Sequence, residues 1–228
     1  MRVSKDKIIM LPSQMAIIRP AQAGISEALE KASATVKRGG VIAYPTETFY
    51  GLGVKFDSRT ALENLCRLKC RSLNKALPLI IGEKRMLGLV ASTVTGPAEK
   101  LIEKFWPGPL TLLLPARANI PDLLTAKTGK IAVRIPGESF ALELARSLEF
   151  PITATSANIS GKPPAVDIDD VVRYFGDAVD LIIDCGKTPG GKPSTIVDAS
   201  GVTVRILRAG AISEEEIFAA LSIASNNQ

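Results

Sequence analysis

Cationic and hydroxyl side chains gather at a few places in the chain, each beside the pattern of a strand or a helix. Lys69, Arg71 and Lys75 place three cations within seven residues, just after a helical pattern. Clustered cations suit a polyphosphate, because charge-assisted hydrogen bonds strengthen when several act together in a partly desolvated site. A solvated basic helix end, favoured by the helix dipole, explains the same residues, and composition alone favours that simpler interpretation.

Two loops carry hydroxyl and amide groups after apolar strand patterns. Ser156 and Asn158 follow one such pattern, and residues 45–53 hold two threonines, a glutamate and a tyrosine after another. Ligands of α/β sheets bind where loops leave the carboxyl ends of strands, and such groups can hold a phosphate or an amino acid. Ordinary turn chemistry produces the same residue types, so neither loop is specific alone.

Residues 186–193 nearly spell a phosphate-binding P-loop after a strand pattern. Pro193 stands where a Ser or Thr hydroxyl would have to reach Mg²⁺, and residues 195–197 continue as a strand instead of a helix. Without a helix N-terminus, no dipole and no row of N–H groups faces a phosphate. We therefore interpret this segment as a turn between strands.

Composition limits the chemistry of the chain. It has 228 residues, 28 Lys and Arg against 23 Asp and Glu, a net charge of +5, and no histidine. The missing histidine excludes Ser-His-Asp triads, His-ligated zinc and imidazole bases. Cys66, Cys70 and Cys185 fit a reducing cytoplasm better than a disulfide scaffold. No apolar segment is long and charge-free enough to span a bilayer, so we expect a cytoplasmic protein without a membrane partner.

Alternating strand and helix patterns predict one α/β domain with a mixed parallel and antiparallel sheet. We expect a flexible leader over 1–14, the domain over 15–212, and a C-terminal helix and tail over 213–228, opened by a Ser213–Glu216 capping box. Helices are expected at 26–37, 58 to about 70, 97–105, 139–148, 168–175 and 213 to about 223. Strands are expected at 15–18, 41–44, 77–81, 110–114, 131–135, 152–155, 181–184, 195–198 and 202–207.

The ordered set of motifs resembles the YrdC-like threonylcarbamoyl-adenylate synthases. Each motif alone is modest, but their order over residues 15–212 is specific. The motifs are Gly39-Gly40-Val41-Ile42-Ala43-Tyr44-Pro45-Thr46-Glu47-Thr48-Phe49-Tyr50-Gly51-Leu52-Gly53, Lys69-x-Arg71, Phe105-Trp106-Pro107-Gly108-Pro109-Leu110-Thr111, Ala132-Val133-Arg134-Ile135-Pro136, Ser156-Ala157-Asn158-Ile159-Ser160-Gly161, Pro193-Ser194-Thr195-Ile196-Val197-Asp198 and Leu207-Arg208-Ala209-Gly210.

The resemblance implies the YrdC-like fold, a twisted mixed sheet flanked by helices around a basic concave cavity. It implies that L-threonine, bicarbonate or CO₂, and ATP with Mg²⁺ give threonylcarbamoyl-AMP and pyrophosphate. The product would serve the N6-threonylcarbamoyl modification of adenosine 37 in tRNA, completed by a separate downstream transferase. Weak binding of tRNA or double-stranded RNA would accompany this function.

The resemblance also assigns residues to the two substrates. The residues implied for ATP are Lys69, Arg71, Lys75, Thr111, Ser156, Asn158 and Arg208. Thr46 and Ser194 are implied for threonine, and Lys69 and Arg71 are also implied to be catalytic. No protein side chain is assigned to a metal, because Mg²⁺ is expected to arrive with ATP.

Three positions depart from the family pattern. Ser72 replaces a proline of many relatives, Ile80 replaces a histidine that contacts threonine in some, and Pro115 replaces a lysine of some. These departures concern the threonine pocket more than the ATP site. Two alternatives therefore stay open: a basic module that binds RNA without chemistry, and a family paralogue that binds nucleotide or double-stranded RNA without using threonine.

Overall fold

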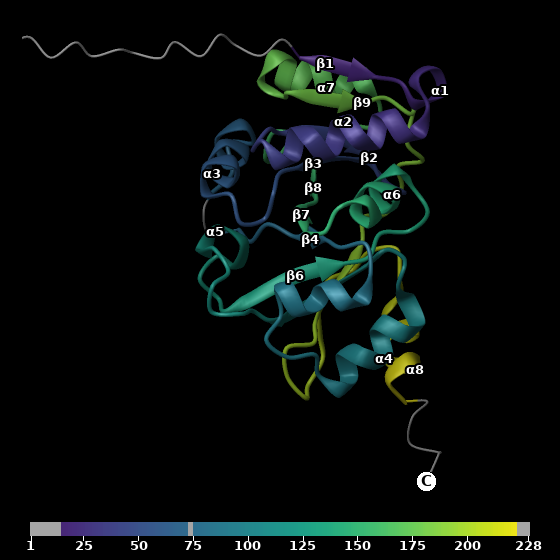
Figure 1. Cartoon of the computed structure of the whole chain (residues 1–228). Coiled ribbons are helices and arrows are strands. Elements are labelled where there is room, and N and C mark those ends of the chain that lie inside the picture. The colour runs from purple at the N-terminus through teal and green to yellow at the C-terminus, as the bar shows by residue number, and fades with distance from the viewer. Residues whose placement is uncertain (1–14, 73–74, 223–228) are drawn as a thin grey trace, which may run out of the picture.

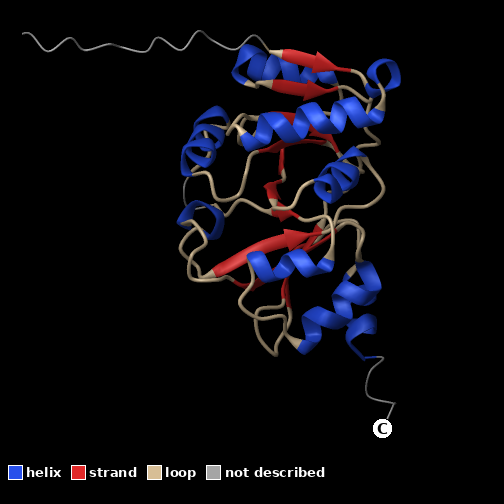
Figure 2. Ribbon diagram, in the orientation of Figure 1, coloured by secondary structure: helices blue, strands red, loops and turns tan. Residues whose placement is uncertain are grey.

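The computed structural model describes residues 15–72 and 75–222, and its strands form two sheets flanked by helices (Figures 1 and 2). The first sheet contains β1 (Ala16–Ile18), β9 (Leu181–Ile183), β2 (Ile42–Pro45), β3 (Tyr50–Gly53) and β8 (Thr155–Ser156), in that order. The second contains β11 (Arg205–Arg208), β10 (Thr195–Asp198), β5 (Leu110–Pro115), β6 (Lys130–Arg134), β4 (Leu79–Ile80) and β7 (Ile152–Thr153), in that order. The expected leader over 1–14 and the end of the expected tail over 223–228 lie outside the described residues.

Both sheets mix parallel and antiparallel neighbours. In the first, β9 runs parallel to β1 and β2, while β3 is antiparallel to β2 and β8. In the second, β5 is parallel to β10 and antiparallel to β6. The expected mixed α/β fold is confirmed, with its strands divided between two sheets.

Helices cover both sheets, and several begin at the residues that sequence signals indicated. They are α1 (Pro20–Ala23), α2 (Ile25–Lys37), α3 (Arg59–Leu68), α4 (Gly96–Phe105), α5 (Asp122–Thr125), α6 (Phe140–Ser147), α7 (Ile168–Phe175) and α8 (Glu214–Ser222), with short 3₁₀ turns at Lys84–Leu89 and Gly176–Ala178. The side chain of Ser58 caps α3 by accepting from the backbone N–H of Ala61. The expected capping box is confirmed, since Ser213 and Glu216 bond to each other's backbone N–H.

The strand expected at 152–155 is two strands that belong to different sheets. β7 is an edge strand of the second sheet and β8 is an edge strand of the first. Ala154 alone separates them, and its N–H donates to the carbonyl of Pro78 instead of to either sheet. The two sheets therefore meet at Ala154, which lines the cavity between them.

The prediction of a loop over residues 46–53 is wrong for its second half, because Tyr50–Gly53 forms strand β3. Gly53 faces the ring of Tyr44, and a Cβ at Gly53 would lie 2.7 Å from Tyr44 Cε1. Glycine here permits close packing of β3 on a buried aromatic ring. Glycine in a sequence is commonly a sign of a loop, and this packing explains why Gly53 lies in a strand instead. Residues 46–49 form the tight turn between β2 and β3.

The segment 186–193 is a turn followed by strand β10, as expected. Gly186, Gly190 and Gly191 have φ angles of +82°, +70° and +90°, which lie in the left-handed region that glycine tolerates. The N–H of Gly190 donates to the carbonyl of Thr48, so the turn rests on the β2–β3 turn. The described element that directly follows 186–193 is a strand and not a helix, and the P-loop interpretation stays excluded.

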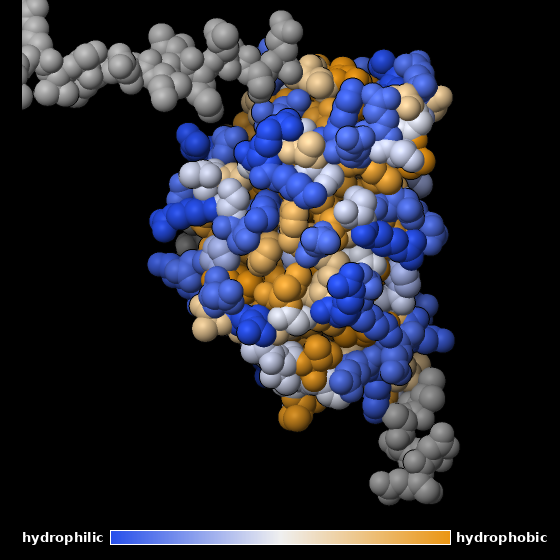
Figure 3. All heavy atoms as spheres, viewed as in Figure 1, coloured by the Kyte–Doolittle hydropathy of each residue, from blue (hydrophilic) through white to orange (hydrophobic). Residues whose placement is uncertain are grey.

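Two clusters of buried apolar side chains hold the sheets and helices together. The smaller cluster joins α2 and α6 to the first sheet through residues such as Ala32, Leu144 and Ile42, and it includes Ile80. The larger joins α3 and α4 to strands of both sheets. On the face shown in Figure 3, hydrophilic side chains cover the outside of the helices and apolar atoms show mainly between them. Among the described residues, no helix has the length and apolarity to cross a membrane.

Candidate functional site

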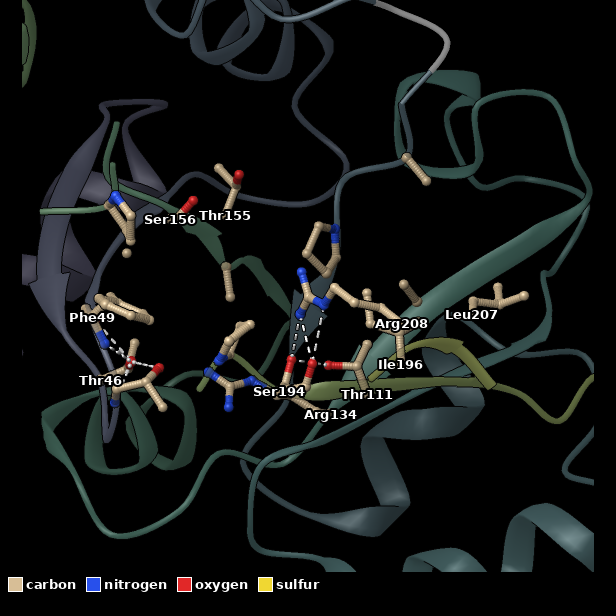
Figure 4. A pocket seen from close by; sticks show the side chains of 18 of the residues that line it. Thr46, Phe49, Thr111, Arg134, Thr155, Ser156, Ser194, Ile196, Leu207 and Arg208 are labelled. Atoms are coloured by element: carbon tan, nitrogen blue, oxygen red, sulfur yellow. Dashed lines mark hydrogen bonds between the residues drawn. The ribbon is translucent and has the colours of Figure 1, made fainter. Parts of the chain in front are cut away.

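A cavity of about 620 Å³ lies between the two sheets, with four cations in its lining. The turn at 46–49 and strand β8 supply one wall, and strands β5, β6, β10 and β11 supply the other. Figure 4 shows Thr46 and Ser156 facing Ser194 and Arg208 across the opening, with Arg134 between them. The lining cations are Arg71, Lys130, Arg134 and Arg208, and no acidic side chain is among the described lining residues.

Arg208 on β11 is fixed against the start of β10. Its guanidinium donates to the carbonyl of Ser194 at 2.7 Å and 3.2 Å and contacts the Ser194 hydroxyl at 3.1 Å. The Ser194 hydroxyl is 3.0 Å from Thr111 Oγ1. Gly210 allows this arrangement, because a Cβ there would lie 2.3 Å from the carbonyl of Pro193. Thr111, Ser194 and Arg208 thus form one hydrogen-bonded group on the wall.

The lining cations differ in their charge partners. Arg134 pairs with Glu47, and Lys130 pairs with Asp198 at 2.6 Å. Arg208 forms no ion pair within residues 15–72 and 75–222; burial and then the charge of Arg134 lower its pKa. An arginine that lines a cavity without a carboxylate neighbour favours an anionic ligand.

Arg71 follows α3 and is the second lining cation that has no carboxylate partner among the described residues. Its guanidinium donates to the carbonyls of Ala76 and Lys75, at 2.6 Å and 3.2 Å. Burial lowers the pKa of Arg71 as well. These bonds join Arg71 to Lys75 and Ala76 and hold the guanidinium at the cavity wall.

Thr46 organises the turn between β2 and β3. Its hydroxyl donates to the carbonyl of Phe49 at 2.8 Å and accepts from the N–H groups of Thr48 and Phe49 at 3.1 Å and 3.2 Å. A threonine hydroxyl that organises a turn is the ordinary turn chemistry that the sequence left open as an alternative. The same hydroxyl nevertheless lies in the lining of the cavity (Figure 4).

Lys69 and Asn158 lie behind Ser156. The Lys69 ammonium donates to the carbonyls of Ser156 and Asn158, the latter at 2.7 Å. Asn158 Oδ1 accepts from the Ser156 hydroxyl at 2.5 Å and lies 3.4 Å from Lys69 Nζ. Burial, followed by the charge of Arg71, lowers the pKa of Lys69 from 10.5 to about 7. Neither Lys69 nor Asn158 is among the residues that line the cavity.

Six of the residues named from the resemblance converge on the cavity lining, and three do not. The lining includes Thr46, Arg71, Thr111, Ser156, Ser194 and Arg208. Lys69 and Asn158 support Ser156 from behind, while Lys75 is exposed outside the lining. Whether each contacts a substrate stays a prediction.

Sequence reasoning assigned no function to Arg134, Lys130 and Glu47. Arg134 and Lys130 lie at the two ends of β6, and both point their charge to the cavity side. The signal for Arg134 was its place in the Ala132–Pro136 motif, beside a strand end. Glu47 orients Arg134 with one oxygen, and its other oxygen, Oε2, is buried without a hydrogen-bond partner.

The three positions that depart from the family pattern are not among the described lining residues of this cavity. Ile80 is fully buried in the smaller apolar cluster, and neither Ile80 nor Pro115 is in the described lining. Cys66 is buried and Cys70 is exposed, so they do not share one environment. Within residues 15–72 and 75–222, no group of three or more carboxylate or thiol side chains could hold a metal ion.

Comparisons with known proteins give a consistent result. The family model Sua5/YciO/YrdC, described as telomere recombination, matches residues 34–210. A threonylcarbamoyl-AMP synthase of Pyrococcus abyssi is 37% identical over 186 residues, which is 82% of this chain and 55% of that protein. A threonylcarbamoyl-AMP synthase of Nitrosococcus oceani is 38% identical over 169 residues, which is 73% of this chain and 90% of that protein. This chain thus spans about half of the first relative and most of the second.

A solved structure agrees with the sequence comparisons. The structure of P. abyssi Sua5 complexed with L-threonine has a TM-score of 0.84 and 34% identity to this chain. The similarity covers 91% of this chain and 61% of that one. The two-sheet fold described above is therefore the fold of that protein's matching part.

Proposed function

Because the chain belongs to the Sua5/YciO/YrdC family, we propose that it makes threonylcarbamoyl-AMP and pyrophosphate from L-threonine, bicarbonate or CO₂, and ATP. The observation that supports this most is the convergence of Arg71 and Arg208 on one cavity. Both lie in its lining, and neither has a carboxylate partner among the described residues. The volume of about 620 Å³ is in the usual range for a site that holds a small ligand.

The cavity suits a reaction that joins two anions. The threonine amine adds to CO₂, loses a proton and becomes a carbamate. A carbamate oxygen then attacks the α-phosphorus of ATP, a new P–O bond forms, and the bond to pyrophosphate breaks. Alignment and charge neutralisation dominate the barrier of such a transfer, and arginine supplies both without an imidazole base.

Each wall contributes residues to both substrates. Arg71 and Ser156 hold the phosphates, with Lys75 at the edge of the site. Thr111 and Arg208 contact the nucleotide, while Thr46 and Ser194 contact threonine. Selection of threonine over valine requires hydrogen bonds to the threonine hydroxyl, which the lining hydroxyl groups can supply.

Magnesium enters this scheme with ATP. The carboxylates nearest the cavity are engaged by cations, Glu47 by Arg134 and Asp198 by Lys130. Phosphate oxygens and water are sufficient ligands for Mg²⁺, which retains several waters in nucleotide sites. The residues at the cavity therefore fit a magnesium ion that is bound by the triphosphate and water and not by protein carboxylates.

The product would be used by a separate transferase in the modification of adenosine 37 of tRNA. A cytoplasmic location and weak contact with tRNA or double-stranded RNA belong to this proposal. A net charge of +5 over 228 residues is a small excess, so direct RNA binding is a minor part of it.

The test is threonine-dependent release of pyrophosphate. Purified protein with ATP, Mg²⁺, bicarbonate and threonine is expected to release pyrophosphate, and omission of threonine or bicarbonate is expected to abolish the release. Equal release without threonine would contradict the proposal, and so would no release above background. Calorimetric titration of threonine in the presence of ATP gives an independent check, because a paralogue that does not use threonine gives no heat.

A further inference from the structure

Lys69 is almost completely buried, with 1% of its surface exposed, although it carries an ammonium group. It is the residue at which α3 ends. A lysine is seldom fully buried without a partner for its charge. Its surroundings therefore decide what the charge does.

The oxygens around Lys69 Nζ come from the loop that follows β8. The ammonium contacts the carbonyl of Ser156, the carbonyl of Asn158 and Asn158 Oδ1. Three acceptors match the three N–H donors of an ammonium group. The backbone of Lys69 joins the same loop, since its carbonyl accepts from the N–H of Ser160 at 2.9 Å.

Asn158 connects Lys69 to the lining of the cavity. Its Oδ1 accepts from the Ser156 hydroxyl at 2.5 Å, and its Nδ2 donates to the carbonyls of Ile159 and Lys162. Ser156 is exposed to the cavity and lies in its lining. One oxygen of Asn158 thus contacts both the buried ammonium and the hydroxyl that faces the ligand space.

We propose that Lys69 is a positioning residue, whose ammonium fixes the loop after β8 so that Ser156 presents its hydroxyl to the cavity, and that Arg71 alone of the two contacts phosphate. The kinetic part of this proposal rests on the proposed function; the structural part does not. Lys69 and Arg71 are two residues apart, but one reaches a set of carbonyls and the other reaches the cavity. A lysine that uses its donors in a buried set of oxygens has none left for a ligand.

The electrostatics of Lys69 make its charge depend on the oxygens that surround it. No carboxylate pairs with it in the part of the chain that is described, and Arg71 is a second cation nearby. Burial and Arg71 both lower its pKa, to about 7. The carbonyl oxygens are then the groups that stabilise the ammonium, and the loop that carries them must stay in place.

The first experiment measures the amide hydrogen exchange of the loop after β8 in the ligand-free protein. Amide hydrogen exchange is followed at Asn158 and Ser160 in the wild type, in Lys69→Met and in Lys162→Met. The control removes an exposed lysine of the same loop. We expect Lys69→Met to speed exchange at both amides at least about tenfold and Lys162→Met to leave it unchanged. Unchanged exchange in a folded Lys69→Met protein would overturn the proposal, because a phosphate-binding lysine has no effect before phosphate arrives.

The second experiment is a double-mutant cycle on pyrophosphate release. Lys69→Met is expected to lower kcat/KM about a hundredfold, the size expected for a displaced group at the reacting centre. In a Ser156→Ala background the same substitution is expected to cost less than about threefold, because the hydroxyl that Lys69 positions is already gone. An equal loss in both backgrounds would instead identify Lys69 as a direct phosphate ligand.

A further variant covers the case in which Lys69→Met does not fold. Asn158→Ala removes the oxygen between Lys69 and Ser156 and leaves the ammonium its two carbonyls. It is expected to be equally non-additive with Ser156→Ala, and additive behaviour would overturn the proposal. If the wild type releases no pyrophosphate, the proposed function fails, while hydrogen exchange still decides the positioning of the loop.

Discussion

The two walls of the cavity are built by different means. On the second-sheet wall, Thr111, Arg134 and Arg208 stand on strands β5, β6 and β11, and each is paired with a residue of a neighbouring strand. On the opposite wall, Thr46, Ser156 and Arg71 stand in turns and at a two-residue strand. Side-chain hydrogen bonds hold those three: Thr46 and Arg71 bond to backbone carbonyls, and Ser156 bonds to the side-chain oxygen of Asn158.

This difference indicates which substitutions should displace the most neighbouring residues. A strand-borne residue is positioned by its backbone ladder, so removing its side chain removes only that side chain. A turn-borne residue is positioned by side chains, so one substitution can move several neighbours. The predictions below test this distinction from the largest effect to the smallest.

Arg71→Ala should have the largest effect, because it removes the proposed phosphate contact and also the bonds of Arg71 to the carbonyls of Lys75 and Ala76. We expect kcat/KM for ATP to fall by about 10²- to 10³-fold in the pyrophosphate assay. Arg67→Ala, one helical turn earlier and exposed, is the matched control and should stay within about twofold of wild type. A loss in Arg71→Ala no larger than in the control would remove Arg71 from the site.

Arg208→Ala should be milder, because β11 stays paired with β10 without the side chain. We expect the KM for ATP to rise about tenfold, with little change in melting temperature. Arg208→Lys should recover little of this, since a lysine cannot reproduce the guanidinium bonds to both oxygens of Ser194. Full recovery by lysine would show that only the charge matters on this wall.

Thr46→Ala should affect both stability and threonine use. Loss of the hydroxyl leaves the N–H groups of Thr48 and Phe49 without their acceptor, at a cost of about 1–3 kcal/mol in the free energy of unfolding. Thr46→Ser keeps the hydroxyl and should restore stability. Urea unfolding measures the first effect and the KM for threonine the second. Equal behaviour of the alanine and serine variants would contradict the turn as the cause.

The last prediction concerns the free energy of unfolding and not activity: Lys69 should make it depend on pH. Its pKa is about 7 in the folded chain and near 10.5 when exposed, so between these values the unfolded state binds more protons. Stability from this group therefore rises with pH across that window and is lowest below pH 7. Urea unfolding of wild type and Lys69→Met should show their difference in stability moving in favour of the wild type as pH increases. A difference that is constant with pH would contradict the lowered pKa.

Local signals in the sequence predicted much of the fold. Ser58, Ser213 and Glu216 act as the caps that their spacing indicated, and the bounds expected for 168–175 and 195–198 match α7 and β10. These features depend on residues within one turn or one strand. Their bounds can be seen locally, although β10 also needs its pairing with β5 and β11.

Features that depend on distant partners were not predictable in this way. The pattern at 152–155 is that of one strand, and its division at Ala154 depends on which edges of the two sheets are free. Spacing placed Lys69 and Arg71 together as equivalent cations, but burial separates them. Glu47 and Arg134 lie 87 residues apart, so their ion pair is visible only once the strands are placed.

The crossing at Ala154 has a mechanical consequence for the whole protein. Adjacent Cα atoms are about 3.8 Å apart, so a link of one residue prevents the sheets from separating at that edge. Any widening of the cavity must then be a rotation about the Ala154 end, largest at the far edge, where β11 carries Arg208. Ligand entry and exit should accordingly change the exchange of amides in β11 while leaving those of β7 and β8 as they were.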